Sequence, residues 1–388
     1  MTKRLLNVSG TMTSLGASRA GPEVIAAVSD SLGRFVAIDE LQAQASAVIA
    51  RVTGAEAGYI TSSSASGMTL AMAAAMTGAD LARIERLPDS EGLKDEVVIQ
   101  AGHLINYGAP VAQAIRIAGA KVVAAGTAAN VETFHIEDAI SDRTAAALFV
   151  VSHHVVQEGQ TGLAEFIAIA KEKGVPVIVD MASEYDLEGP FRLGANIAIW
   201  SAHKFLGGPT AGIVAGRKDL IRAAYLQNRG IGRHMKAGKE AVVGAIAALE
   251  AWAKRDHAAA QKREQAIVAS WQKALAPVKG LMLAVHHDWT SNPIDRLQVT
   301  VTREAGLHAW ELADRLAARD PSVRVRDDLI EHGYFFLDPC NVIEAEAREA
   351  SAAIMDEIAK AQSGADGFKV TLAERRRNAI ESALRWPD

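Results

Sequence analysis

Short apolar runs alternate with longer amphipathic segments along this chain up to about residue 250. The runs show little polar alternation, which is typical of strands in a parallel sheet covered on both faces. The segments between them, such as Val111–Ala118 and Ala164–Lys173, have helical spacing. The pattern predicts an α/β fold with a mostly parallel seven-stranded sheet and helices on both faces. The expected strands are Tyr59–Thr61, Glu96–Gln100, Lys121–Ala124, Ala146–Val151, Val175–Asp180, Ile197–Trp200 and Gly212–Ala215.

The pattern changes beyond a long helical stretch, Glu240–Leu275. Further strands and a covering helix are expected after it, and they indicate a smaller α+β domain. The predicted division is a large domain, residues 1–250 with the N-terminal segment, and a small C-terminal domain, residues 251–388. The expected elements of the small domain are strands at Asp295–Thr302, Ser322–Arg326 and Tyr334–Leu337 and a helix at Glu344–Ala361.

Composition narrows the class of protein. Of 388 residues, 49% are hydrophobic and 22% charged, and the net charge of −5 argues against a broad nucleic-acid or membrane-surface footprint. The one cysteine, Cys340, excludes an intramolecular disulfide and gives no metal-site spacing, so no metal is expected. No apolar run has the length of a membrane span, and the N-terminal apolar stretch is too short for a signal peptide. We therefore expect a cytoplasmic protein.

Two residues at the ends of apolar runs suggest a pyridoxal 5′-phosphate (PLP) site. Lys204 follows a buried strand in Ser201-Ala202-His203-Lys204 before a Gly-Gly-Pro turn, and a lysine there suits a Schiff base with PLP. Asp180 ends another strand, where a carboxylate could keep the pyridine nitrogen protonated. Taken alone, Lys204 could be an exposed loop lysine and Asp180 a helix cap. Their combination favours the cofactor site.

The phosphate end of the site is expected in the Ser-rich turn that precedes an Ala/Met-rich helix. A helix N-terminus with serine hydroxyls binds anions. Ser63, Ser64 and Ala65 are the first candidates, with Ser201 as a second hydroxyl donor. The alternative is an ordinary serine N-cap.

Several other side chains are candidates for the ring and the substrate. His103 could stack on the cofactor and act in catalysis, His154 could approach the substrate, and His203 could serve the phosphate or only the turn. The cationic candidates for an anionic substrate are Arg233, Lys236 and Lys239, in a Gly-rich stretch; each could instead be a solvated surface charge. Thr11 and Thr13 could close over the site.

These motifs give the chain a family resemblance from about Asn7 to Ala253. It resembles fold type I (aspartate aminotransferase-like) PLP enzymes, and within them the bacterial selenocysteine synthase family, L-seryl-tRNA(Sec) selenium transferase. The resemblance lies in Leu5–Thr11, Ala65-Ser66-Gly67, Ser201–Pro209 and Gly212–Ile221.

The resemblance implies PLP bound as an imine to Lys204, Asp180 on the pyridine nitrogen, and a homodimer or larger ring with shared active sites. The chain departs from the synthase because the core pattern starts at its first residues, where the synthase usually carries a tRNA-binding region. The stretch Gly230–Glu240 is more similar to smaller relatives, D-glucosaminate-6-phosphate ammonia-lyases and similar lyases or racemases.

The function predicted from these observations is a PLP-dependent lyase for a hydroxy amino acid or an amino-sugar acid. Lys204 would remove the α-proton, and β-elimination with deamination would give a keto acid and ammonia. The alternatives are an amino-acid racemase, then an aminotransferase or a selenium-transferase-like enzyme, and last a non-catalytic PLP-binding protein. A small amino-acid-type substrate is expected, with nucleic acid unfavoured by the charge.

Overall fold

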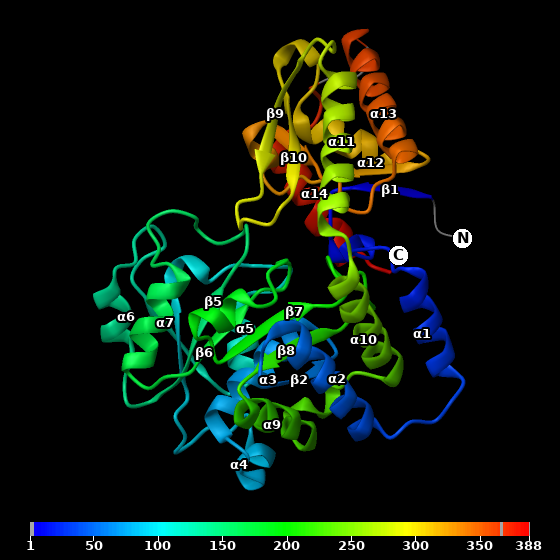
Figure 1. Ribbon diagram of the computed structural model, residues 1–388. Helices are drawn as coiled ribbons and strands as arrows, with labels where there is room; N and C mark the ends of the chain where they lie inside the picture. Colours follow the sequence, from blue (N-terminus) through cyan, green and yellow to red (C-terminus); the bar gives the residue numbers. More distant parts are fainter. Residues whose placement is uncertain (1–3, 365–367, 388) are drawn as a thin grey trace. The chain divides into compact units, whose positions relative to one another are not determined.

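The computed structural model describes residues 4–364 and 368–387 and contains two compact units (Figure 1). The larger unit runs from Ser18 to Arg255. The smaller unit contains the described residues up to Ala17 and from Asp256 onward.

The larger unit is built on a seven-stranded sheet with the order β2-β8-β7-β6-β5-β3-β4. Neighbouring strands from β7 through β4 run parallel, and β8 is antiparallel to both β7 and β2. The predicted mostly parallel seven-stranded sheet is therefore confirmed. The strands are β2 (Ala57–Thr61), β3 (Glu96–Gln100), β4 (Lys121–Ala125), β5 (Thr144–Val150), β6 (Val177–Asp180), β7 (Ile197–Ser201) and β8 (Gly212–Gly216).

Both faces of this sheet are covered, which explains its uninterrupted apolar strands. In β6, Val177 and Val179 join one hydrophobic cluster while Ile178 joins the other, because alternate side chains point to opposite faces. Residues of α2, α6, α7 and α10 belong to the first cluster, and residues of α3, α5 and α9 to the second. The helices are α1 (Pro22–Leu32), α2 (Ile38–Thr53), α3 (Ser64–Thr77), α4 (Leu81–Arg86), α5 (Val111–Ile117), α6 (Thr133–Ala139), α7 (Leu163–Glu172), α8 (Gly189–Leu193), α9 (Lys218–Leu226) and α10 (Lys239–Lys254).

The smaller unit has a separate core and two small sheets. Strand β1 pairs in parallel with β11, and β10 lies between β12 and β9 in an antiparallel sheet. Trp271, Leu297, Phe335 and Ile354 are buried between these strands and the helices. The elements are β1 (Leu5–Val8), α11 (His257–Leu275), β9 (Leu281–His287), β10 (Asp295–Val301), α12 (Ala309–Ala318), β11 (Ser322–Val325), β12 (Tyr334–Leu337), α13 (Glu344–Gln362) and α14 (Leu372–Leu384).

Two features differ from the sequence analysis. The predicted large domain includes the N-terminal segment, but β1 belongs to the smaller unit through its pairing with β11. The helical stretch expected at Glu240–Leu275 is two helices, α10 and α11. Arg255 is extended, and the Asp256 side chain accepts a hydrogen bond from Ala259 N at 2.9 Å, which caps the second helix.

Candidate functional site

The candidate residues come together at the carboxyl edge of the seven-stranded sheet. Asp180 ends β6 and is paired with Ile199 of β7, while Ser201 ends β7 opposite Gly212 of β8. Gly212 is also paired with Thr61, the last residue of β2. Because the parallel strands end at one edge, segments far apart in sequence meet there.

Lys204 lies in a compact turn directly after β7. Backbone bonds close this turn, from Ala202 N to Ala211 O at 2.9 Å and from Gly207 N to Lys204 O at 3.1 Å. Gly207 has a φ of 69°, which glycine adopts without strain. The Lys204 side chain is partly buried, and its Nζ donates a hydrogen bond to Ser183 Oγ at 2.6 Å. The lysine amine is thus held at the sheet edge by a hydroxyl that the sequence analysis did not single out.

Asp180 is a buried carboxylate, only 7% exposed, whose hydrogen-bonding capacity is incompletely used. Its Oδ1 has no hydrogen-bond partner among the described residues. Burial raises the pKa of Asp180 to about 6, although the charge of Lys204 and a hydrogen bond from the backbone of Ala182 act in the opposite direction. The protonated nitrogen of a pyridine ring would supply both a donor and a positive charge. The carboxylate therefore fits the predicted PLP site.

Serine hydroxyls from two segments meet at the N-terminus of α3. Ser201 Oγ donates to Ser64 Oγ at 2.8 Å, so the two predicted phosphate donors lie together. Ser63 is the N-cap, and its Oγ accepts a hydrogen bond from Ser66 N at 3.1 Å. A Cβ on Gly212 would lie 2.2 Å from Ser63 O, so β8 can begin beside this turn only with glycine there. Ala65 lies in the first turn of the helix. The arrangement provides hydroxyls at a helix N-terminus, which suits a phosphate.

The three candidate histidines occupy different environments. His103 is 2% exposed, its Nδ1 accepts a hydrogen bond from Val150 N at 3.2 Å, and its ring centroid is 4.5 Å from that of Phe149. Burial lowers the pKa of His103 to about 4; burial and then the charge of Lys204 lower that of His203 to about 4. His154 is exposed. His103 thus contacts core groups here, and its stacking on a cofactor stays a prediction.

The predicted cationic loop lies beside the Ser-rich turn. The carbonyl of Met235 accepts hydrogen bonds from Thr61 Oγ1 at 2.9 Å and Ser62 N at 3.1 Å, and Lys236 is bridged to Thr61. Arg233, in the same short helical turn as Met235, is exposed and could reach an anion.

Two other candidates from the sequence lie elsewhere. Lys239 Nζ donates to Leu32 O at 3.2 Å and Arg34 O at 2.5 Å, and so holds the end of α1. Thr11 belongs to the smaller unit, so its contact with substrate stays a prediction.

Comparison with known proteins places this chain in a family. The family described as SelA, L-seryl-tRNA selenium transferase, matches residues 5–278. The chain belongs to this family. A D-glucosaminate-6-phosphate ammonia lyase of Salmonella typhimurium is 38% identical over 345 residues, which are 89% of this chain and 92% of the relative. A 5′-C-glycyluridine monooxygenase-decarboxylase of a Streptomyces species is 34% identical over 93% of this chain and 91% of its own length.

Solved structures confirm the fold class. The structure of a D-glucosaminate-6-phosphate ammonia-lyase superposes with a TM-score of 0.83 at 36% identity, covering 93% of this chain and 97% of that one. An aspartate aminotransferase from Thermus thermophilus has a TM-score of 0.56 at 15% identity, with 92% of each chain covered, and supports the fold alone. This SelA-family chain therefore has the fold type I architecture that the sequence predicted.

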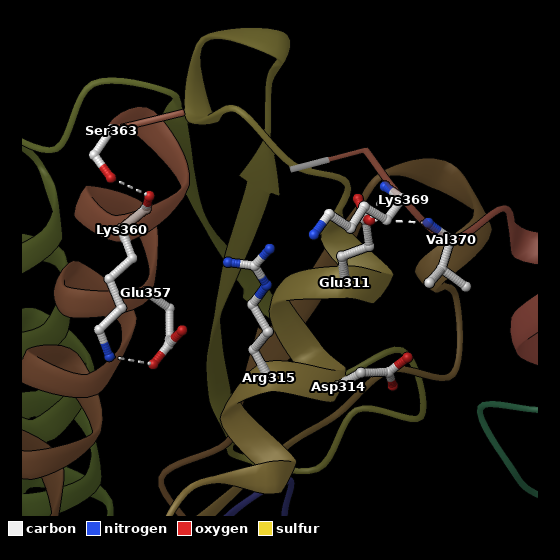
Figure 2. A pocket seen from close by; sticks show the side chains of 8 residues that line it. All are labelled: Glu311, Asp314, Arg315, Glu357, Lys360, Ser363, Lys369 and Val370. Atoms are coloured by element: carbon white, nitrogen blue, oxygen red, sulfur yellow. Dashed lines mark hydrogen bonds and ion pairs between the residues drawn. The ribbon is translucent and has the colours of Figure 1, made fainter. Parts of the chain in front are cut away.

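A hollow with charged walls is lined by none of these candidate residues (Figure 2). It has a volume of about 550 Å³ and lies in the smaller unit. Some of its charged groups are engaged with one another or with the backbone: Lys360 Nζ donates to Glu357 Oε1 at 3.1 Å, and Glu311 Oε1 accepts from Val370 N at 3.0 Å. Among residues 4–364 and 368–387, no group of His, Cys, Asp and Glu forms a metal site. Across those same residues, no helix is long and apolar enough to span a membrane.

Proposed function

We propose that this protein is a PLP-dependent ammonia-lyase that acts on an amino-sugar acid or a hydroxy amino acid. The observation that carries the proposal is the buried carboxylate of Asp180, with one oxygen lacking a partner among the described residues, on the same sheet edge as Lys204. The similarity to D-glucosaminate-6-phosphate ammonia-lyase supports the type of reaction.

The residues of the larger unit would hold PLP at three points. When bound, PLP supplies a protonated ring that withdraws electrons from the Cα of an amino acid. Asp180 would accept the hydrogen bond from the ring nitrogen and keep it protonated. Ser64 and Ser201, with the amides at the start of α3, would bind the phosphate, and Lys204 would provide the amine that attaches the aldehyde.

Lys204 would also move the proton in the reaction. Its Nζ would take the proton from Cα, and the C–O bond at Cβ would break with its electron pair leaving on oxygen. That oxygen would take up a proton and depart as water. Hydrolysis of the resulting unsaturated amine gives a keto acid and ammonia. A lysine held beside the sheet edge is suited to this role because it stays close to Cα.

The anionic end of the substrate would be bound by Arg233, with His154 as a further predicted contact. The position of the Arg233 loop beside Ser62 supports this assignment. We also propose that the protein is a homo-oligomer. Ile25, Leu32, Phe35 and Ile38, in and between α1 and α2, are exposed apolar side chains of the larger unit, and an apolar surface of this kind favours association. Cytoplasmic location stays a prediction.

Trapping and product analysis test the proposal. Borohydride reduction after incubation with PLP should label the peptide that contains Lys204, and Lys204→Ala should abolish both label and turnover. With D-glucosaminate 6-phosphate and a panel of D- and L-hydroxy amino acids, the wild-type protein should release equal amounts of ammonia and keto acid. Absence of label on Lys204 would reject the cofactor site.

A competing activity is suggested by the 34% identical monooxygenase-decarboxylase. A monooxygenase-decarboxylase reaction would consume O2 and release CO2, whereas the elimination reaction would do neither. Oxygen consumption during turnover would therefore favour this second function. Inverted substrate without ammonia would indicate a racemase, and dependence on an added keto acid an aminotransferase.

A further inference from the structure

The loops that follow β6 and β7 are held together by three aromatic side chains. The ring centroid of Tyr185 lies 4.4 Å from that of Phe205 and 4.9 Å from that of Trp252 in α10, edge-on in both cases. Aromatic pairs at these distances favour this geometry. Phe205 is next to Lys204 in the chain, and Tyr185 follows Ser183 by two residues. The cluster therefore fixes the course of both loops around the lysine.

Backbone hydrogen bonds also join these two loops where they leave the sheet. Met181 N donates to Ile199 O at 2.8 Å and Ser201 N to Ala182 O at 3.1 Å, so the pairing of β6 with β7 continues past Asp180. Lys204 N in turn donates to Ser201 O at 3.3 Å. Ser183 and Lys204 are thus attached to adjacent, paired backbones. The 2.6 Å bond between Lys204 Nζ and Ser183 Oγ is a contact between two constrained segments.

We infer that Ser183 is a positioning residue for Lys204, whose hydroxyl holds the lysine amine at the place from which it attaches PLP and later takes the Cα proton. This inference rests on the proposed function and adds a residue to it. A hydroxyl suits the task because it accepts a hydrogen bond without adding a charge, and Asp180 already supplies the negative charge of this edge.

The test compares the apoproteins of wild type, Ser183→Ala and Ser183→Thr. Each is mixed with PLP, quenched with borohydride over time, and the labelled peptide containing Lys204 is quantified. Loss of a hydrogen bond to a charged group should slow labelling by Ser183→Ala by about 10- to 100-fold. Ser183→Thr keeps the hydroxyl and should restore most of the rate. In the lyase assay, kcat should fall by a similar factor with KM within about twofold, because substrate binding is not the affected step.

Ser31→Ala is the matched control. Ser31 is a fully buried serine of α1 whose hydroxyl donates to Val28 O at 2.7 Å, outside the site, so its removal should leave the labelling rate unchanged. If Ser183→Ala does not fold, Ser183→Cys fills the same space with a weak acceptor and should show the same slow labelling. Labelling of Ser183→Ala at the wild-type rate would overturn the inference alone. Failure of the wild type to label at Lys204 would overturn the proposed function as well.

Discussion

Two buried aspartates, one in each unit, differ in how their charge is compensated. Asp338 of the smaller unit is 1% exposed, and Arg296 Nε donates to its Oδ2 at 2.6 Å while Cys340 N donates to its Oδ1 at 2.9 Å. Asp180 of the larger unit is almost as buried, yet its Oδ1 has no partner among the described residues. The positive charges of Arg296 and Arg326 hold the pKa of Asp338 below its usual value, whereas burial raises that of Asp180 to about 6.

We interpret the difference as that between a carboxylate whose charge the fold itself compensates and one proposed to bind a cofactor. Burial opposes ionisation in both, so burial alone does not explain the opposite shifts. At Asp338 the fold supplies two guanidinium groups and an amide, and the charge is stabilised within the chain. At Asp180 the fold supplies one lysine and one amide hydrogen bond, which do not offset desolvation. A carboxylate left in this condition at a strand end is typical of a functional site.

The largest expected effect on stability comes from removing the positive charge of Arg296 beside Asp338. Arg296→Met would leave Asp338 and Asp288, its other hydrogen-bonded partner, buried without their main countercharge. Breaking such a cluster is expected to lower the free energy of unfolding by about 3–5 kcal/mol. Unfolding of the purified wild type and variant in guanidinium chloride measures this difference in the free energy of unfolding.

Arg34→Met serves as control for this change. Arg34, just beyond the end of α1, forms an exposed pair with Asp30 of that helix, and loss of the pair should change stability by less than about 0.5 kcal/mol. A loss below 1 kcal/mol in Arg296→Met would show that the arginine does not compensate the buried acids.

The second expected effect, for Asp180→Asn, is an increase in the free energy of unfolding. Because the folded pKa of Asp180 is about 6 and the ordinary value is 3.8, its ionisation opposes folding, and wild-type apoprotein should lose stability as pH rises from 4 to 6. Asp180→Asn abolishes this loss, so the apoprotein should gain about 3 kcal/mol at pH 7. The same variant should lose activity by about 10²–10³-fold, since an amide does not keep the ring nitrogen protonated. Unfolding curves at several pH values and a lyase assay measure both.

Asp95→Asn provides the matched comparison. Asp95 is also buried, but Arg143 and Lys121 lower its pKa, so its ionisation supports folding. This support is lost as pH falls through its folded pKa, and its amide variant should be less stable than wild type at pH 7. If both amide variants shift stability in one direction, the distinction between the two kinds of carboxylate fails.

The local pattern of apolar residues was sufficient to predict the strands of the sheet in the larger unit. The runs before Gln100 and Asp180 end where β3 and β6 end, because strands buried on both faces must be apolar throughout. The strand β1 was not expected in the smaller unit, since its partner β11 lies near the other end of the chain and pairing over that separation leaves no local signal. The break before α11 depends on one capping residue, Asp256, inside an otherwise helical pattern.

The candidate site also contains residues that local sequence predicts and one that depends on contacts between distant segments. Lys204, Asp180, Ser64 and Ser201 were predicted because each follows a recognisable strand end, and the structure brings the last two into contact. Ser183 could not be predicted, because its contact with Lys204 depends on the course of two loops set by Tyr185 and Phe205. His103 illustrates the limit, since a strand-end histidine can equally face the core.

The smallest expected effect is on the affinity for PLP when the hydroxyls of Ser64 and Ser201 are removed. It would sharpen the contrast between the proposed cofactor site at Asp180 and the ion-pair cluster around Asp338. Ser64→Ala and Ser201→Ala should each weaken PLP binding by about 1 kcal/mol, or roughly fivefold in Kd. Because the hydroxyls bond to each other, the first loss disturbs the second donor, and the double variant should lose less than the sum. Titration of apoprotein followed by absorbance gives these constants, and pyridoxal, which lacks the phosphate, gives the control. Equal weakening of pyridoxal binding would show that the serines stabilise the turn and do not contact phosphate.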